Sequence, residues 1–434
     1  MQEAFMNRFK SSVSLLKLRA SYGEIGNQVV LFSSGAQNYY PYIPSTTPSN
    51  SSWINSGTDI LNVTVPAPPL VSANFTWERV QTSNLGLDFG FLNNRLTGSA
   101  DIFTRKTLGM LAAGSELPTI LGAAAPLQNV ADLKVKGWEL TLAWKDQVRD
   151  FKYALSFNLS DNQAYITKYD NKGGLLNFAG NGTLSNYYVG QKVGDVWGFQ
   201  TQGFYTTDDF VAGSLNSNLQ GGVLKPGVAP YKGVPQNPGD IRYADVNGDN
   251  VIFTGNNTLS NSGDRMIIGN NNRRLQFGIN GGVSYKSLDL SFSVIGVGKR
   301  DIWISNQVFF PYQNQFSGIF THELNYWTPS NLTAYFPRYY PNATGNTGTS
   351  EMVQTRYLSN GAYTRLKNIT LGYKLPTKLI GKIYQGGARV FFSGENLMTW
   401  DHLPAGLDPE ASDLGSGGIY PFIKKFSFGI NISF

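Results

Sequence analysis

Hydrophobic and polar residues alternate along several segments of this chain. The segment 151–162 is the clearest case, because every second residue is apolar: Phe151, Tyr153, Leu155, Phe157 and Leu159. Segments 275–285 and 424–434 repeat the pattern. A period of two residues is typical of a β-strand with one apolar face. Segments of this kind predict ten strands, at residues 14–23, 80–92, 95–105, 135–145, 150–162, 274–286, 288–299, 361–375, 387–398 and 422–434.

The connections between the predicted strands alternate between short and long. Short turns are expected around Asn93 and Asn94, around Asp146 and around Ser287, with a somewhat longer one at 375–387. The long connections cover residues 24–79, 106–134, 163–273, 300–360 and 399–421. Outer-membrane barrels sort their connections in this way, with short turns in the periplasm and long loops outside the cell. We therefore predict an all-β fold, an antiparallel transmembrane β-barrel with long extracellular loops.

The composition favours a membrane barrel over a soluble domain. The chain has 48 Gly, 27 Phe and 23 Tyr, whereas charged residues make up only 15%, against about 25% in soluble domains. Aromatic residues gather near the predicted strand ends, as in interfacial girdles: Trp138, Trp144, Phe151, Tyr153, Tyr285 and Tyr373. The alternative is a soluble or surface-attached all-β protein that binds carbohydrate or peptide, in which the apolar faces form a core.

Other features of the sequence exclude several classes of protein. The net charge is +6 and the basic residues are scattered, whereas nucleic-acid binding needs a concentrated basic patch. Cysteine is absent, so neither disulfides nor cysteine metal sites can form. No stretch approaches the roughly 20 apolar residues of a membrane helix. The first residues also lack the apolar core of a secretory signal, so we expect the signal peptide to be absent from this chain.

No residue pattern predicts catalysis. His322 and His402 are the only histidines, and neither a Gly-x-Ser-x-Gly elbow nor a phosphate-binding P-loop occurs. Asp208 and Asp209 are adjacent in a Thr-rich segment, where paired carboxylates are more often solvated than catalytic. Glycosidases need two carboxyl groups at a set separation across a sugar, which sequence neighbours do not establish. We expect no enzyme activity.

The segment DVNGDN at 245–250 resembles the start of a calcium loop. Such loops place oxygen ligands at alternate positions and end in a bidentate Glu. The candidate ligands are Asp245, Asn247, Asp249 and the carbonyl of Val251. Asn250 replaces the usual Gly and Asn256 replaces the Glu, so Asp264 would have to fold back to complete the site. Two interpretations stay open, a Ca²⁺ site and an Asx-rich turn held by side-chain hydrogen bonds.

The long connections are rich in aromatic residues. These are Tyr39, Tyr40, Tyr42, Trp53, Tyr187, Tyr188, Trp197, Phe199, Phe309, Phe310, Tyr312, Tyr326, Trp327, Tyr339, Tyr340 and Trp400. Such rings can stack on a substrate or contact a partner. Connections of this length also need small cores of their own, and we expect most of these residues to be structural.

Seven segments, in order along the chain, resemble the SusC/RagA family of TonB-dependent transporters of Bacteroidota. The hairpin WERVQTSNLGLDFGFLNNRLTGSADIFTRKT at 77–107, the loop GDIRYADVNGDNVI at 239–252 and the segment GLDPE at 406–410 are three of them. The others lie at 16–28, 117–140, 363–376 and 392–400. Each motif alone is weak, whereas seven in family order are specific. The resemblance runs from the first twenty residues to the last fifteen.

The resemblance implies a larger transporter in the outer membrane. Family members form a plugged barrel of about 22 strands, of which residues 1–434 resemble the C-terminal portion. We expect the plug domain and the TonB box to be absent from this chain. The implied partners are outer-membrane lipid, a SusD-like lipoprotein lid, the TonB complex through the N-terminal region, and an oligosaccharide or peptide substrate. Phe434 ends an alternating strand and resembles the signal read by the outer-membrane assembly machinery.

Overall fold

The structure of the protein is a computed structural model, and it describes most of the chain. The described residues are 12–30, 37–54, 61–113, 117–122, 125–304, 309–310, 318–340, 350–376, 387–411 and 423–433. No helix within these ranges is long and apolar enough to cross a membrane.

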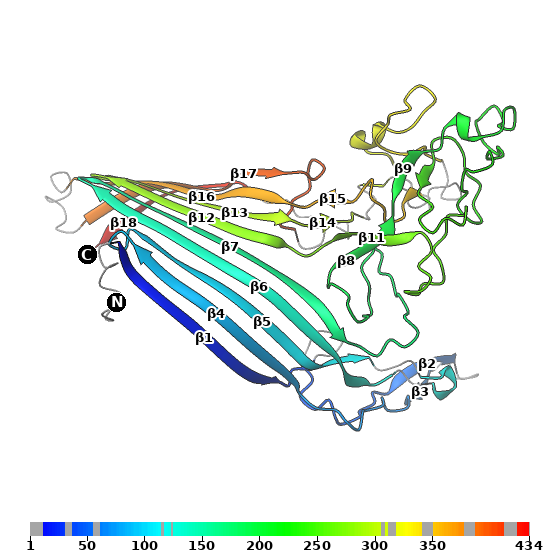
Figure 1. Cartoon of the computed structure of the whole chain (residues 1–434), viewed down its shortest axis with the longest axis horizontal. Helices are drawn as coiled ribbons and strands as arrows, with labels where there is room; N and C mark the ends of the chain where they lie inside the picture. Colours follow the sequence, from blue (N-terminus) through cyan, green and yellow to red (C-terminus); the bar gives the residue numbers. More distant parts are fainter. Residues whose placement is uncertain are drawn as a thin grey trace.

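Ten strands form one antiparallel sheet that makes up the body of the protein (Figure 1). Each strand pairs with the sheet strands before and after it in the chain. Their bounds are Val13–Asn27 (β1), Glu78–Phe91 (β4), Leu96–Ala113 (β5), Leu127–Val148 (β6), Phe151–Lys168 (β7), Arg274–Tyr285 (β12), Leu288–Lys299 (β13), Tyr363–Lys374 (β16), Gly387–Asp401 (β17) and Lys425–Ser433 (β18). These are the ten strands that the alternation predicts.

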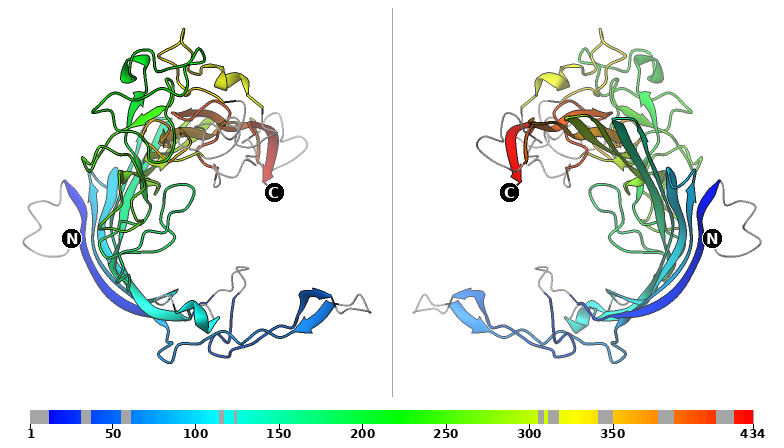
Figure 2. Two further views of the ribbon diagram at one scale, coloured as in Figure 1. Left: turned by 90° about the vertical axis from the view of Figure 1, so that its right-hand side faces the viewer. Right: turned by 90° about the vertical axis from the view of Figure 1, so that its left-hand side faces the viewer.

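The sheet is strongly curved, and its cross-section is an open arc (Figure 2). β1 and β18 are the two edges of the sheet. Tight connections gather at one end of the strands, and the long connections gather at the other end (Figure 1). The predicted sorting of short and long connections is therefore confirmed.

The tight turns rely on residues in the left-handed backbone region. Leu92, Asn93 and Asn94 between β4 and β5 have φ of 52°, 57° and 62°, and Lys286 between β12 and β13 has φ of 53°. Asn tolerates this region better than most residues. Two-residue hairpins favour it because the turn then matches the twist of the strands.

Several predicted boundaries of β5, β6 and β7 are wrong; β7, for example, has a predicted end at residue 162 and runs on to Lys168. Asp146 lies within β6, and the turn falls after Val148. β5 runs on to Ala113 and β6 begins at Leu127, so the connection predicted at 106–134 is shorter. Lys106 and Lys134 occupy outward positions of these extensions, where the predicted strands have apolar residues. The alternation therefore disappears although backbone pairing continues.

In their described residues, the long connections contain eight further short strands, which pair as four small sheets. These are β2 (Ser49–Ile54) with β3 (Leu61–Thr64), β8 (Asp195–Phe199) with β11 (Arg265–Asn270), β9 (Thr201–Phe204) with β10 (Ile241–Tyr243), and β14 (Asp301–Ile302) with β15 (Ser359–Asn360). Short 3-10 helices occupy Thr119–Leu121, Thr207–Asp209 and Thr321–Leu324. None of these elements shows the alternation of the large sheet.

Candidate functional site

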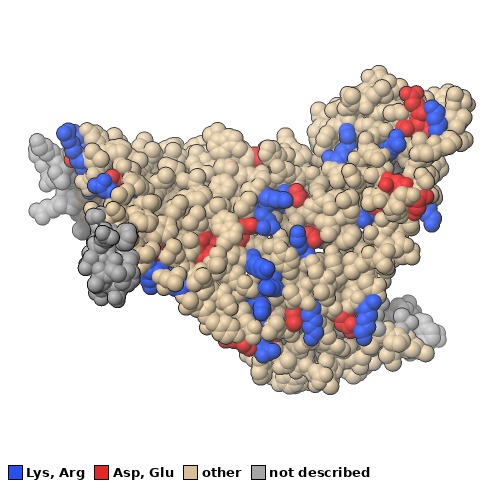
Figure 3. All heavy atoms as spheres, in the orientation of Figure 1, with Lys and Arg blue, Asp and Glu red and all other residues tan. Residues whose placement is uncertain are grey.

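An apolar belt covers the outward face of the sheet. One row of register partners crosses nine neighbouring strands: Leu16, Phe89, Gly98, Leu142, Phe157, Ile279, Val294, Leu366 and Met398. The convex face is largely free of charged atoms toward the turn end (Figure 3). On β7 the outward apolar residues run from Phe151 to Leu159, about the nine residues that a tilted strand needs to cross the hydrocarbon. Such a face fits lipid.

The inward face carries the polar half of the alternation. A parallel row reads Thr97, Ala143, Ser156, Asn280, Ser293, Asn368, Glu395 and Lys425. Arg19 donates hydrogen bonds to Asp88 at 2.8 Å and to Asp101 at 2.9 Å, each on a different strand. Arg389 on β17 likewise donates a hydrogen bond across the sheet, to Asp289 on β13. Polar, cross-linked walls of this kind suit a wet lumen.

Aromatic residues lie at both edges of the apolar belt. Phe151 and Tyr285 are register partners at the turn end, and Tyr373 lies in the same row through Leu288. The predicted position of Trp138 near a strand end is wrong, because β6 continues well beyond it. Trp138 instead marks the upper edge of the belt, since the next outward residue along the strand is a lysine.

The described residues of the two longest connections, within 169–273 and 300–362, pack together, and we name them the loop module. Its core consists of Phe199, Ile241, Tyr243, Ile252, Ile302, Trp303, Ile304, Phe309, Phe310, Phe336 and Tyr357. Polar groups are also paired inside it: the Tyr340 hydroxyl donates to Asp240 at 2.6 Å, and burial raises the Tyr340 pKa. Most of the described loop aromatics are partly or fully buried, which confirms the expected structural role.

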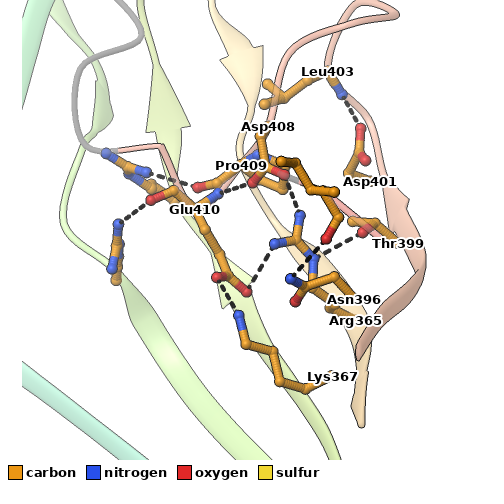
Figure 4. Close-up of polar contacts among 12 residues, drawn as sticks. Arg365, Lys367, Asn396, Thr399, Asp401, Leu403, Asp408, Pro409 and Glu410 are labelled. Atoms are coloured by element: carbon orange, nitrogen blue, oxygen red, sulfur yellow. Dashed lines mark hydrogen bonds and ion pairs between the residues drawn. The ribbon is translucent and has the colours of Figure 1, made fainter. Parts of the chain in front are cut away.

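A buried cation joins the GLDPE segment to the wall of the sheet (Figure 4). Arg365 on β16 is 1% exposed. Its guanidinium lies against the carboxylates of Asp408 and Glu410, and its Nε donates to Thr399 Oγ1 at 2.8 Å. Lys367 also donates to Glu410, at 2.9 Å. This network was not predicted from the sequence, although both the strand and the GLDPE segment were singled out there. The available signal was a pair of cationic residues on the strand and two acidic residues in the later segment.

The Asp/Asn loop at 245–250 forms successive Asx turns. The Asp245 carboxylate accepts the N–H groups of Gly248 at 2.7 Å and Asn250 at 2.8 Å. Asn247 and Asp249 each accept the N–H two residues further on. Asn250 has φ of 62°, the conformation that Gly usually supplies at this position of calcium loops.

Asp264 folds back onto this loop, as the calcium interpretation requires. Its side chain is fully buried, and its two oxygens accept the N–H groups of Val246 at 2.8 Å and Phe253 at 2.9 Å. Among the described residues, no three His, Asp or Glu side chains gather as a metal site would need. The hydrogen bonds are those of an Asx-rich turn. Calcium binding by Asp245, Asn247, Asp249, Val251 and Asp264 stays a prediction.

The remaining described residues singled out in the sequence lie in separate contacts. Asp209 accepts hydrogen bonds from Thr206 N–H at 2.7 Å and from Arg242 at 2.9 Å, which gives it a structural role. His322 lies on the short helix Thr321–Leu324 beside Glu323. Phe434, Tyr312 and the side chain of Trp53 lie outside the described residues, so the assembly role of Phe434 stays a prediction.

A hollow of 380 Å³ lies in the connection between β1 and β4. Its aromatic lining consists of Tyr39, Tyr42, Phe75 and Trp77. Tyr39 is 72% exposed, so its ring is available for contact. Exposed aromatic rings around a hollow can stack on flat, partly apolar ligands.

The comparison with protein-family models matches this architecture. The model described as "TonB dependent receptor-like, beta-barrel" covers residues 9–250, more than half of the chain. The chain belongs to the TonB-dependent receptor β-barrel family. Relatives of this type are outer-membrane proteins, which agrees with the apolar belt and places this barrel wall in the outer membrane.

TonB-dependent receptors of two bacteria are similar to this chain over nearly its whole length. TonB-dependent receptor P3 of Formosa agariphila is 28% identical over 98% of this chain and 40% of the relative. TonB-dependent receptor SusC of Bacteroides thetaiotaomicron is 26% identical over 97% of this chain and 38% of the relative. The chain therefore spans about two fifths of the length of these relatives.

A solved structure has the same fold. The RagAB peptide transporter aligns with a TM-score of 0.69 and 24% identity, over 99% of this chain and 42% of that chain. The similarity in sequence to SusC and the similarity in fold to RagAB agree with the predicted resemblance to the SusC/RagA type.

Proposed function

We propose that this chain forms barrel wall and extracellular loops of a TonB-dependent transporter that imports glycans or peptides. The observation that carries the proposal is the two-faced sheet. Its outward face is apolar over the thickness of a membrane, its inward face is polar, and its long connections all leave from one end. A wall of this kind separates lipid from a wet lumen, which a transport pathway needs.

We further propose that the extracellular end receives the substrate under a SusD-like lipoprotein lid. The loop module has its own packed core, so it can present a fixed surface to substrate and partner. The aromatic hollow between β1 and β4 offers rings on which sugars or peptide side chains can stack. The similarity to SusC and to a peptide transporter supports both substrate classes equally.

Uptake by cells tests the transport proposal. A deletion strain would be supplied with labelled oligosaccharides and labelled peptides, with and without an agent that collapses the inner-membrane proton gradient. We expect the intact gene to restore uptake of one class only while the membrane is energised, because TonB drives import. Restoration that is independent of energy, or uptake unchanged by the deletion, would refute the proposal.

A matched pair of variants ties uptake to the faces of the wall. Phe157→Arg places a charge on the lipid face, which costs about 2–4 kcal/mol at mid-membrane, whereas Asn158→Arg places it in the lumen. We expect Phe157→Arg to reduce the amount of assembled protein and uptake together, and Asn158→Arg to keep assembly. A soluble binding protein, the alternative, would remain in the aqueous fraction after lysis without detergent.

A further inference from the structure

A row of lysines without partners crosses the outward face just above the apolar belt. Lys106 on β5 and Lys134 on β6 are register partners, and Lys136 is the partner of Thr104. Lys106 lies four residues beyond Ile102, which belongs to the belt, so both project from the same face. Lys136 and Lys134 likewise follow Trp138 at intervals of two. We name Lys106, Lys134 and Lys136 the lysine row.

The lysine row carries uncompensated charge. Within the part of the chain that the structure describes, none of the three ammonium groups has an ion pair or a side-chain hydrogen bond. The acidic groups nearby form ion pairs with other residues: Glu24 with Arg79, and Asp161 with Arg274. Asp132 accepts the N–H of Gly109. Figure 3 shows a band of Lys and Arg across the convex face, with Asp and Glu interspersed in it.

The arrangement costs stability in the protein alone. Like charges directly opposite each other on neighbouring strands repel, and they are destabilising. Lys106 and Lys134 stand in that relation. An anion between them would remove the repulsion, and three lysines on two adjacent strands would surround it.

The position of the row identifies the anion. A strand rises about 3.4 Å per residue, so Lys136 and Lys134 lie roughly 7 and 14 Å along the strand beyond Trp138. With the tilt of the strands, this is the headgroup layer outside the hydrocarbon. The long connections leave from the same end, which the proposed orientation places outside the cell. The leaflet there is built from phosphorylated glycolipid.

We propose that the lysine row binds the phosphate groups of the outer-leaflet glycolipid, lipid A. The lysines act as point charges on flexible stems, which suits phosphate, and Tyr165, the register partner of Lys134, flanks them. The proposal depends on the orientation of the barrel and not on which substrate it imports.

Lipid binding by the purified protein tests the proposal. The triple variant Lys106→Gln/Lys134→Gln/Lys136→Gln is compared with a control that loses the same charge at the turn end, Lys145→Gln/Lys152→Gln/Lys286→Gln. Lipid A, and lipid A freed of phosphate by phosphatase, are titrated into each protein in neutral detergent. Each lysine near an anionic surface contributes about a fivefold change in affinity. We expect the triple variant to bind lipid A at least tenfold more weakly and the control to match the wild type.

Removal of the phosphates from lipid A should weaken binding to the wild type as much as the triple substitution does. Equal binding of both lipids by the wild type, or an equal loss in the control variant, would overturn the proposal. In lipid-free neutral detergent, the triple variant should unfold at the same or a higher temperature than the wild type, because the repulsion is gone. The single variant Lys134→Gln should bind lipid A about fivefold more weakly than the wild type.

Discussion

Among the charged side chains that are almost fully buried in the described part of this protein, Arg365, Asp264 and Glu323 are each stabilised differently. Arg365 is enclosed by two carboxylates, and Asp264 accepts two backbone N–H groups. Glu323 accepts one, from Phe320, and desolvation raises its pKa. Burial of a charge is costly unless hydrogen bonds or an opposite charge compensate it. These residues therefore fix the positions of the loop segments that hold them.

At the residue scale, we propose that the Asp/Asn loop binds Ca²⁺. Asp245→Asn/Asp249→Asn retains oxygen acceptors for the turns but removes two charges. We expect Ca²⁺ to raise the thermal stability of the wild type, and EDTA to reverse the rise, whereas the double variant should respond to neither. The measurement is thermal unfolding followed by tryptophan fluorescence. If Ca²⁺ does not change the unfolding temperature of the wild type, the loop is an Asx-rich turn and not a Ca²⁺ site.

Burial makes Glu351 sensitive to pH. Desolvation raises its pKa from 4.5 to about 7. The folded protein therefore binds more protons than the unfolded chain between these two values, and stability falls as pH rises through that window. Glu351→Gln removes the titrating group, so its unfolding temperature should fall less between pH 5 and pH 8 than that of the wild type. An equal change in unfolding temperature with pH in the wild type and in Glu351→Gln would contradict this account.

At the element scale, glycines let large rings cross to neighbouring strands. A Cβ on Gly296 of β13 would lie 2.2 Å from the Phe277 ring and 2.5 Å from the Tyr363 carbonyl oxygen. We expect Gly296→Ala to destabilise the barrel by about 1–3 kcal/mol, as overpacking does. Gly23 of β1 has no atom within 4 Å of its Cβ position, so Gly23→Ala is the matched control. Chemical denaturation in detergent measures both, and equal midpoints would contradict the packing described.

The sequence predicts the strands of the wall well because lipid imposes the alternation. Within the belt every outward position must be apolar, as from Phe151 to Leu159, and the register then follows. Beyond the belt, Lys106 and Lys134 show that outward positions become polar, and prediction fails there. The short strands β8 and β14 and the Arg365 network could not be predicted, because tertiary contacts between distant segments determine them.

At the scale of the whole molecule, Arg365 holds an extracellular segment against the wall. Arg365→Met removes the cation and leaves the carboxylates of Asp408 and Glu410 without it, at a cost of about 3–5 kcal/mol for a broken buried pair. We expect faster hydrogen exchange and proteolysis of residues 401–411. Arg79→Met breaks an exposed pair with Glu24, which is worth about 0–1 kcal/mol, and should change neither. Protection of residues 401–411 in Arg365→Met equal to that of the wild type would show that the network does not anchor the segment.

The curved sheet as a whole acts as a boundary between two solvents. Its convex face presents the apolar belt, and its concave face presents paired charges and small polar residues. The rows continue from strand to strand, so a slip of one strand by one residue would turn its polar side chains toward the lipid. It follows that the convex face is the one that contacts lipid.

A cysteine scan along β7 tests this most directly, because the natural chain contains no cysteine. Single cysteines at positions 155 to 160, in the protein assembled in membranes, would be labelled with a lipid-soluble and a water-soluble thiol reagent. The account predicts that cysteines replacing Leu155, Phe157 and Leu159 react with the lipid-soluble reagent, and those replacing Ser156, Asn158 and Ser160 with the water-soluble one. Labelling without a period of two, or with the two sets exchanged, would contradict it.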